Sequence, residues 1–172
     1  MKVAVVSDSH DHFYNLDRAT TLIKAAGIND CLHLGDFCAP GFVKEMLVSG
    51  LRWTCVWGNV DGAKAKIVLE HGANPNFDIA EESFRELEIA GRKVFQTHFP
   101  LLARNAAESG RYDIAFYGDN HTKKIDTLAN GTVLANPGEL AGFKSGQPSF
   151  GIWDTEENNF EIVDLPDFKI SR

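Results

Sequence analysis

The sequence has little of what membrane-spanning, secreted or nucleic-acid-binding proteins require. No apolar run approaches the ~18 residues of a membrane span, so no membrane partner is expected. The three cysteines are odd in number and lack CxxC spacing, which favours a reducing, cytoplasmic setting. Asp and Glu number 24 against 17 Lys and Arg, and the resulting net charge of −7 disfavours binding to nucleic acid.

The motifs of several enzyme classes are also missing. The chain has no GxxxxGK[ST] P-loop and no GxSxG nucleophile motif. It also lacks GxGxxG, which speaks against the nucleotide-binding protein that an early strand–helix pattern would otherwise permit. Apolar residues make up 44% and charged residues 24% of the 172 positions, as in an average soluble protein. This length predicts one domain over residues 1–172, which can bury roughly 70% of the surface that its unfolded chain exposes.

The first half of the chain predicts alternating strands and helices. Val3 to Val6 is a short β-branched run typical of a strand buried on both faces. Apolar residues then recur at helical spacing from about Asn15 to Ala26. A strand from Cys31 to Leu34, a helix around Phe42 to Val48 and a strand from Trp53 to Val56 follow. This order implies parallel strands with right-handed crossovers.

The second half predicts hairpins and so a different kind of sheet. Leu101 to Glu108 is typical of a helix, and Asp113 to Tyr117 of a strand. Three hairpins are expected, pairing Phe84–Ala90 with Lys93–Thr97, Lys124–Leu128 with Thr132–Ala135, and Phe150–Asp154 with Phe160–Val163. The predicted fold class is therefore α/β, with two mixed β-sheets covered by helices.

Polar side chains of the kinds that bind metals fall at the carboxyl ends of the predicted strands. Ligands bind at that edge of open α/β sheets because adjacent loops diverge there. Carboxylate oxygens and imidazole nitrogens are ligands for divalent ions, and this many side chains could share two ions. The residues are Asp8, His10, Asp36, Asn59, His98, Asp119 and His121.

The ordered set of motifs resembles the calcineurin-like metallophosphoesterases, in particular their small bacterial and archaeal phosphodiesterase (YfcE-like) branch. The family pattern is DxH, GD, GN, a lone His, GHxH and then NPG. The corresponding segments here, in the same order over nearly the whole chain, are Asp8-Ser9-His10, Gly35-Asp36, Gly58-Asn59, His98, Gly118-Asp119-Asn120-His121 and Asn136-Pro137-Gly138. The resemblance implies a four-layer αββα fold, with the two sheets packed as a sandwich and flanked by helices.

The same resemblance implies a binuclear metal centre and an activity. Asp8, His10, Asp36 and His121 would hold the first ion. Asp36, Asn59, His98 and Asp119 would hold the second, with the two oxygens of Asp36 bridging the pair. The implied reaction is hydrolysis of a small phosphodiester by a hydroxide that bridges the two ions.

One departure from the family pattern is Asp119, which stands where the family usually has histidine. A third carboxylate would lower the net positive charge of the site and favour oxygen-loving ions. We therefore expect Mn²⁺, with Ni²⁺, Co²⁺, Fe²⁺ or Zn²⁺ as alternatives. A shifted register would give His121 and Lys123 the two histidine positions. Gly118 anchors the ungapped register, and a protonated lysine is a poor ligand, so the ungapped register is favoured.

The other departure concerns the proton donor. Many relatives have histidine directly after the GN asparagine as general acid, whereas this chain has Val60 followed by Asp61. The same loss is found in the small phosphodiesterase branch. His12, on the same loop as His10, is the nearest candidate for the catalytic general acid, a role worth ~10²–10⁴-fold.

Two further interpretations accompany the metal site. His33 is expected to be a structural histidine, and Asn136-Pro137-Gly138 a turn that supports the site. The alternative function is a catalytically weak or inactive scaffold of the same fold that binds protein partners, as the retromer subunit of this fold does. Six of the seven ligand positions are unchanged from the family pattern, which favours the enzyme.

Overall fold

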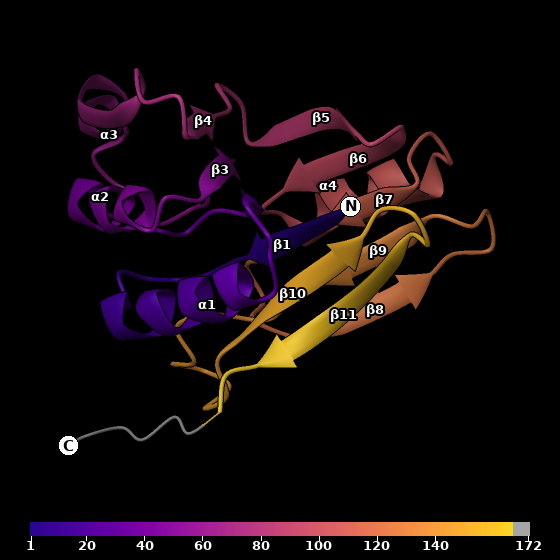
Figure 1. Ribbon diagram of the computed structural model, residues 1–172. Coiled ribbons are helices and arrows are strands. Elements are labelled where there is room, and N and C mark those ends of the chain that lie inside the picture. Colours follow the sequence, from indigo (N-terminus) through magenta and orange to yellow (C-terminus); the bar gives the residue numbers. More distant parts are fainter. Residues whose placement is uncertain (167–172) are drawn as a thin grey trace.

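The computed structural model describes residues 1–166, whose strands form two mixed sheets (Figure 1). In the first sheet, β1 to β4 are parallel, β10 is antiparallel to β1, and β11 is antiparallel to β10. This sheet has the order β11 (Asn159–Asp164), β10 (Ser149–Asp154), β1 (Lys2–Val6), β2 (Asp30–His33), β3 (Arg52–Cys55) and β4 (Phe77–Ile79).

The second sheet has parallel strands at its centre and an antiparallel strand at each edge. β6, β7 and β9 are parallel, while β5 pairs antiparallel with β6, and β8 pairs antiparallel with β9. Its order is β5 (Phe84–Ile89), β6 (Arg92–Thr97), β7 (Ile114–Phe116), β9 (Val133–Asn136) and β8 (Lys124–Thr127). The parallel β-α-β-α-β start and the three hairpins predicted from the sequence are confirmed.

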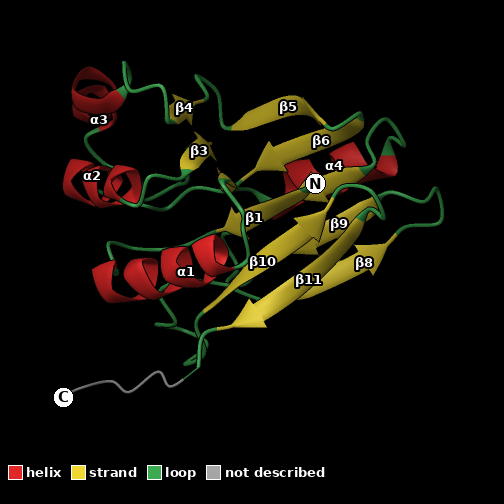
Figure 2. Ribbon diagram, viewed as in Figure 1, coloured by secondary structure: helices red, strands yellow, loops and turns green. Residues whose placement is uncertain are grey.

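Helices cover the outer faces of the two sheets, which makes four layers (Figure 2). α1 (Phe13–Ala25) and α2 (Pro40–Val48) pack on the first sheet, and α4 (Pro100–Glu108) packs on β6 and β7 of the second. The predicted two-sheet sandwich flanked by helices is therefore confirmed. None of the helices within residues 1–166 is long and apolar enough to cross a membrane.

Two short elements were missed by the sequence analysis. α3 (Lys64–His71) buries only Ile67, and its N-cap residue Ala63 has no side chain that can cap, so neither periodicity nor a start signal marks it. β4 is only three residues long and lies at the edge of its sheet. Both elements follow β3, in the stretch that leads from the first sheet to the second.

The core between the sheets is built from their facing apolar side chains. Val5 and Leu34 come from the first sheet and its loops, and Ile114 and Phe116 come from β7. The Phe116 ring is fully buried, and its centroid lies 5.7 Å from that of Trp153 and 5.2 Å from that of Phe160. A central aromatic cluster thus holds the two sheets face to face.

Removing the Phe116 ring should be strongly destabilising. We expect Phe116→Ala to lower the free energy of unfolding by about 3–5 kcal/mol, because it leaves a cavity between the sheets. Urea unfolding measures the loss. Phe84→Ala, at a ring that is 39% exposed on β5, is the matched control and should cost clearly less. Equal losses for the two variants would contradict the central role of this cluster.

Candidate metal centre

The seven predicted metal-binding side chains come from loops that follow the strands of both sheets. Four lie after β1, β2 and β3 of the first sheet, and three lie after β6 and β7 of the second. The Nε2 of Gln96 on β6 donates to the carbonyls of His33 and Thr54, both at 2.9 Å, and His98 Nδ1 lies 2.8 Å from the carbonyl of Leu34. These bonds tie the two sheets together directly beneath the site.

The loops that carry these residues hold an unusual backbone. Non-glycine residues rarely adopt positive φ, and such conformations cluster at functional sites where surrounding contacts enforce them. Main-chain bonds between the loops provide such contacts, from Asp8 N to Gly35 O at 3.1 Å and from His10 N to Asp36 O at 2.9 Å. Five of the seven candidates have positive φ: Asp8 (52°), His10 (44°), Asp36 (59°), Asp119 (66°) and His121 (60°).

Two glycines let these loops approach one another. A Cβ on Gly58 would overlap the Asp36 carboxylate, and a Cβ on Gly118 would overlap the side chains of Ser7 and Asp8. Both positions therefore require glycine for steric reasons. This gives a physical reason for the glycines of Gly58-Asn59 and Gly118-Asp119.

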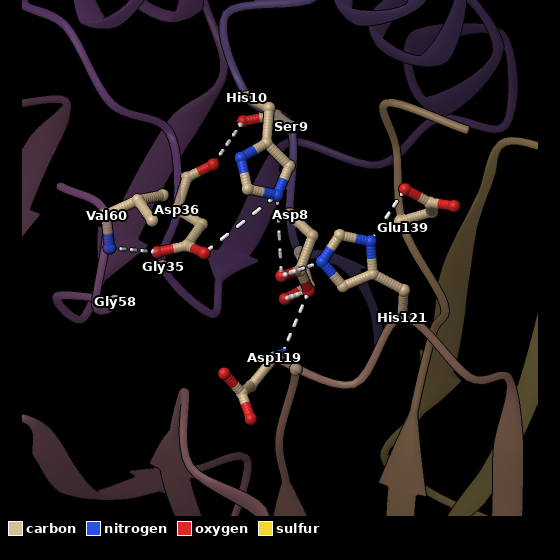
Figure 3. A network of polar contacts seen from close by, with 12 residues as sticks. Asp8, Ser9, His10, Gly35, Asp36, Gly58, Val60, Asp119, His121 and Glu139 are labelled. Carbon is tan, nitrogen blue, oxygen red and sulfur yellow. Dashed lines mark hydrogen bonds and ion pairs between the residues drawn. The ribbon is translucent and has the colours of Figure 1, made fainter. Parts of the chain in front are cut away.

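One cluster of ligand-type atoms is formed by Asp8, His10 and His121 (Figure 3). Asp8 Oδ1 lies 3.3 Å from His121 Nε2 and 3.9 Å from His10 Nε2. The two imidazole rings are stacked, with centroids 5.2 Å apart. All the ligand atoms of this cluster lie within 4.8 Å of one another, a spacing that one ion could span.

A second cluster is formed by Asp8, Asp36 and His98. Asp36 Oδ2 lies 3.3 Å from His98 Nε2, and Asn59 Oδ1 lies 2.9 Å from the same nitrogen. Asp36 Oδ2 also lies 3.9 Å from His10 Nε2, whereas its Oδ1 accepts a hydrogen bond from Val60 N at 3.0 Å. A single oxygen of Asp36 thus faces residues of both predicted ligand sets.

Two buried atoms of the site have no hydrogen-bond partner within the described part of the chain. They are Asp8 Oδ1, in a fully buried residue, and His10 Nε2, in a side chain that is 20% exposed. Leaving such atoms unpaired costs roughly 1–3 kcal/mol each, more for charged groups. A divalent cation would satisfy both atoms at once, so the residues present fit a metal ion.

The electrostatics of the cluster favour positive charge among its carboxylates. Burial raises the pKa of Asp8, outweighing the charge of His98 and the Ser7 hydrogen bond. Burial acts the same way on Asp36, but the hydrogen bond and charge of His98 prevail and lower its pKa. Burial alone would lower the pKa of His98, but Asp36 and Asp8 together raise it.

Asp119 belongs to neither of the two clusters. Its carboxylate is 39% exposed, and its Oδ1 lies 3.7 Å from His98 Nε2. In Figure 3 it points away from His121, while its backbone N–H donates to Asp8 Oδ2 at 3.2 Å. Lys123, the alternative of the shifted register, instead directs its Nζ to the Asp164 carboxylate. The structure therefore supports the ungapped register.

His12 caps the first helix rather than joining either cluster. Its Nδ1 accepts a hydrogen bond from Asn15 N at 3.2 Å, and its ring lies 5.4 Å from that of Phe143. An imidazolium form could not accept that bond, because both of its nitrogens would then be donors. The role of His12 as general acid stays a prediction.

Asp61 supports the site and was missed by the sequence analysis. Its carboxylate accepts hydrogen bonds from the backbone N–H groups of Gly58 at 2.6 Å, Cys38 at 2.8 Å and Asp36 at 3.0 Å. It therefore ties the loop after β2 to the loop after β3. Its place directly after Gly58-Asn59-Val60, where acidic residues often accept bonds from a turn, was the available signal.

Glu139 is the second support that the sequence analysis missed. Its buried carboxylate lies 2.7 Å from His121 Nδ1 and also accepts hydrogen bonds from the backbone N–H groups of Phe143, Lys144 and Ser145. A carboxylate that binds the second nitrogen of a ligand histidine fixes the orientation of its ring. Its only sequence signal was its position directly after Asn136-Pro137-Gly138.

The two predicted supports, His33 and the Asn136-Pro137-Gly138 turn, have that role. Asn136 Nδ2 donates to Gly118 O at 3.1 Å and to Asn120 Oδ1 at 3.0 Å, so it holds the loop that carries Asp119 and His121. His33 is fully buried, with Nε2 3.0 Å from Ser9 Oγ and Nδ1 accepting from Gly35 N at 3.2 Å. Both predictions are confirmed.

Comparison with known proteins agrees with this geometry. Residues 1–158 match the calcineurin-like phosphoesterase superfamily domain. The chain belongs to this superfamily. It is 32% identical over 166 residues to phosphodiesterase MJ0936 of Methanocaldococcus jannaschii, covering 95% of this chain and 99% of that protein.

Solved structures of this superfamily share the fold. An archaeal phosphodiesterase superposes with a TM-score of 0.87 at 30% identity, covering 96% of this chain and 100% of that one. The Escherichia coli phosphoesterase Yfce superposes with a TM-score of 0.70 at 21% identity, covering 95% and 98% of the two chains, which shows the fold alone. The four-layer αββα architecture is therefore that of the superfamily.

The buried His33 should make stability depend on pH. Burial lowers the pKa of its imidazole to about 3, against about 6.5 in an unfolded chain. Between these values the unfolded chain binds one more proton, so the free energy of unfolding falls by about 1.4 kcal/mol per unit of decreasing pH. Urea unfolding of the metal-free protein between about pH 7 and pH 4 measures this slope. His33→Gln should lower the slope by that amount, and an unchanged slope would contradict the assignment.

Proposed function

We propose that the protein is a metal-dependent phosphodiesterase that hydrolyses a small phosphodiester. The observation that carries the proposal is the pair of Asp–His clusters in a chain that aligns over nearly its full length with a phosphodiesterase. Two buried atoms of these clusters have no hydrogen-bond partner in the described part of the chain. The proposed domain is residues 1–172, and the family match over residues 1–158 supports it.

The proposed ligands fall into two sets that share one carboxylate. Asp8, His10, Asp36 and His121 hold the first ion. Asp36, Asn59, His98 and Asp119 hold the second. Asp36 Oδ2 lies near both His10 Nε2 and His98 Nε2, which supports Asp36 as the ligand that the two sets would share. Asp119 is the weakest ligand, and its exposure supports contact with the ion through water.

Two bound divalent ions would supply positive charge for the phosphate and would acidify a water molecule between them. The chain's own residues do the rest. Glu139 holds the His121 ring in one orientation, and Asp61 fixes the backbone on which Asp36 lies. His12 is the proposed proton donor to the leaving group, acting from the loop of His10, and as an imidazolium it would release the hydrogen bond that its Nδ1 accepts from Asn15 N.

The proposed ions are Mn²⁺, with Ni²⁺, Co²⁺, Fe²⁺ or Zn²⁺ as alternatives. Three carboxylates and one amide oxygen against three imidazoles make an oxygen-rich ligand set, which suits Mn²⁺. We also propose a reducing, cytoplasmic setting, which the three free cysteines support. The net charge of −7 supports a small substrate rather than a nucleic acid polymer.

Asp36→Ala should abolish hydrolysis more completely than His12→Ala. We expect Asp36→Ala to lower the rate on bis(p-nitrophenyl) phosphate by on the order of 10³-fold or more and to lower metal content, because the shared ligand is lost. His12→Ala should keep the metal content of the parent and lose only the contribution of a proton donor. Metal analysis and steady-state kinetics measure both effects.

Asp126→Ala, at a half-buried aspartate on β8 that lies outside the site, is the matched control and should behave as the parent protein. A parent-like rate for Asp36→Ala would overturn the proposed mechanism. Parent-like kinetics for His12→Ala would remove His12 from it and leave the metal centre in place.

Asp119→His should strengthen the second metal site. The imidazole reaches farther than the carboxylate and adds no negative charge, so we expect tighter binding of the second ion and a higher rate. In the parent protein, mild chelation should remove the second ion and the activity before the first ion is lost. Calorimetric titration of both proteins with Mn²⁺ measures the two affinities. Unchanged affinities at both sites would show that Asp119 faces solvent and is no ligand.

A further inference from the structure

Phe143 is an exposed aromatic ring beside the proposed metal ligands. Its side chain is 63% exposed, although its ring centroid lies 6.5 Å from that of His10 and 5.4 Å from that of His12. Single exposed apolar side chains are common and need no explanation by themselves. Here the exposed ring is in the first layer of side chains next to a cluster of buried, metal-type residues.

The backbone of Phe143 is fixed to the same cluster. The Glu139 carboxylate accepts hydrogen bonds from the N–H groups of Phe143 at 3.1 Å and Lys144 at 2.9 Å, and it also contacts His121 Nδ1 at 2.7 Å. Gly142, with φ of 70°, starts this turn, and Gly146 N donates to Gly142 O at 3.0 Å to close it. One buried carboxylate therefore positions both a proposed ligand and the exposed ring.

The neighbouring ring of His12 is fixed as well. Its hydrogen bond from Asn15 N holds it at the start of α1, and its plane is tilted by 51° from that of Phe143. Two aromatic rings from distant segments thus form one edge of the site, and the larger of them keeps most of its surface open. A ring on a backbone that is already fixed loses less conformational entropy when another ring packs on it than a ring on a mobile loop would lose.

We propose that Phe143 is a specificity-determining residue that packs against a flat ring on one ester arm of the phosphodiester. The inference rests on the proposed function, because it needs the phosphate to be held by the ions. Aromatic surfaces prefer offset-stacked or edge-to-face contact with other rings, which an alkyl arm cannot provide. The substrate class is therefore a phosphodiester with an aryl group or a nucleobase.

Binding of phosphonates, whose P–C bond is not hydrolysed, tests this directly. The probes are methylphosphonate, phenylphosphonate and 9-(2-phosphonomethoxyethyl)adenine, titrated into the Mn²⁺-loaded protein by calorimetry. In the parent protein we expect a ring-bearing phosphonate to bind about fivefold to tenfold more tightly than methylphosphonate. Phe143→Ala should reduce this preference to less than about twofold, and Phe143→Trp should retain it.

The variants keep the contacts that hold the loop, because Glu139 binds its main chain and not the Phe143 side chain. Metal content equal to that of the parent checks that the site is intact. Leu69→Ala, which truncates an 85% exposed side chain on α3, is the matched control and should keep the ring preference of the parent.

The outcomes distinguish an aryl arm from a nucleobase, and they distinguish a failure of this inference from a failure of the proposed function. Loss of preference for phenylphosphonate in Phe143→Ala assigns an aryl arm, and loss for the adenine phosphonate assigns a nucleobase. A parent protein that binds methylphosphonate without any ring preference, or a preference that Phe143→Ala leaves unchanged, would overturn only the role of Phe143. Failure of all three phosphonates to bind would overturn this inference, whereas the proposed function is overturned only if Mn²⁺-dependent hydrolysis of bis(p-nitrophenyl) phosphate is absent.

Discussion

The burial of two carboxylates beside each other is the constraint on which the rest of this structure depends. Asp8 and Asp36 are 0% and 2% exposed, and their oxygens lie within 4.8 Å of each other in a cluster with His98. Two negative charges repel each other strongly where water is excluded, and removing each carboxylate from water also costs free energy. His98 offsets part of this cost, as the opposite directions of the Asp36 and His98 pKa shifts show. Asp8 Oδ1, which has no hydrogen-bond partner among residues 1–166, is what remains for a cation to balance.

A cluster of this kind needs a scaffold that prevents it from relaxing. Five of the candidate ligands have a backbone of positive φ, which unconstrained chains avoid. The carboxylates of Asp61 and Glu139 accept hydrogen bonds from backbone N–H groups of three loops and so hold these loops in place. These two acids do not belong to either ligand cluster, yet their hydrogen bonds fix the positions of the ligands. The strain of the loops is thus balanced by hydrogen bonds formed below and beside the site.

The two-sheet architecture explains why the site forms at this place. Neither sheet carries a complete set of ligand-type residues, since His98, Asp119 and His121 come from the second sheet and the others from the first. Apolar packing around Phe116 and Trp153 brings the sheets together, and the Gln96 side chain aligns them at the strand ends. A displacement of one sheet relative to the other would therefore separate the ligands. The stability of the core and the geometry of the site are consequences of the same packing.

The amino-acid order alone encodes the elements with strong local patterns and the succession of ligand-type residues. The β-branched run of β1, the helical spacing of α1 and the hairpin turns each lie within a few residues, so they were predictable. α3 was not, because its single buried residue leaves no periodic signal. Gly58 and Gly118 are visible in the sequence as parts of the Gly-Asn and Gly-Asp motifs, although their steric role depends on Asp36 and Asp8 lying against them.

Tertiary packing, in contrast, determines which side chains meet. Glu139 lies 18 positions from His121, and Asp61 lies 25 positions from Asp36, so no local pattern could pair them. The exposure of Asp119, the single oxygen of Asp36 that faces both histidines, and the position of Phe143 beside His12 depend in the same way on how loops from different strands pack. Residue type is a property of the chain, but the distance between two residues far apart in sequence is a property of the packed sheets, and the chemistry depends on that distance.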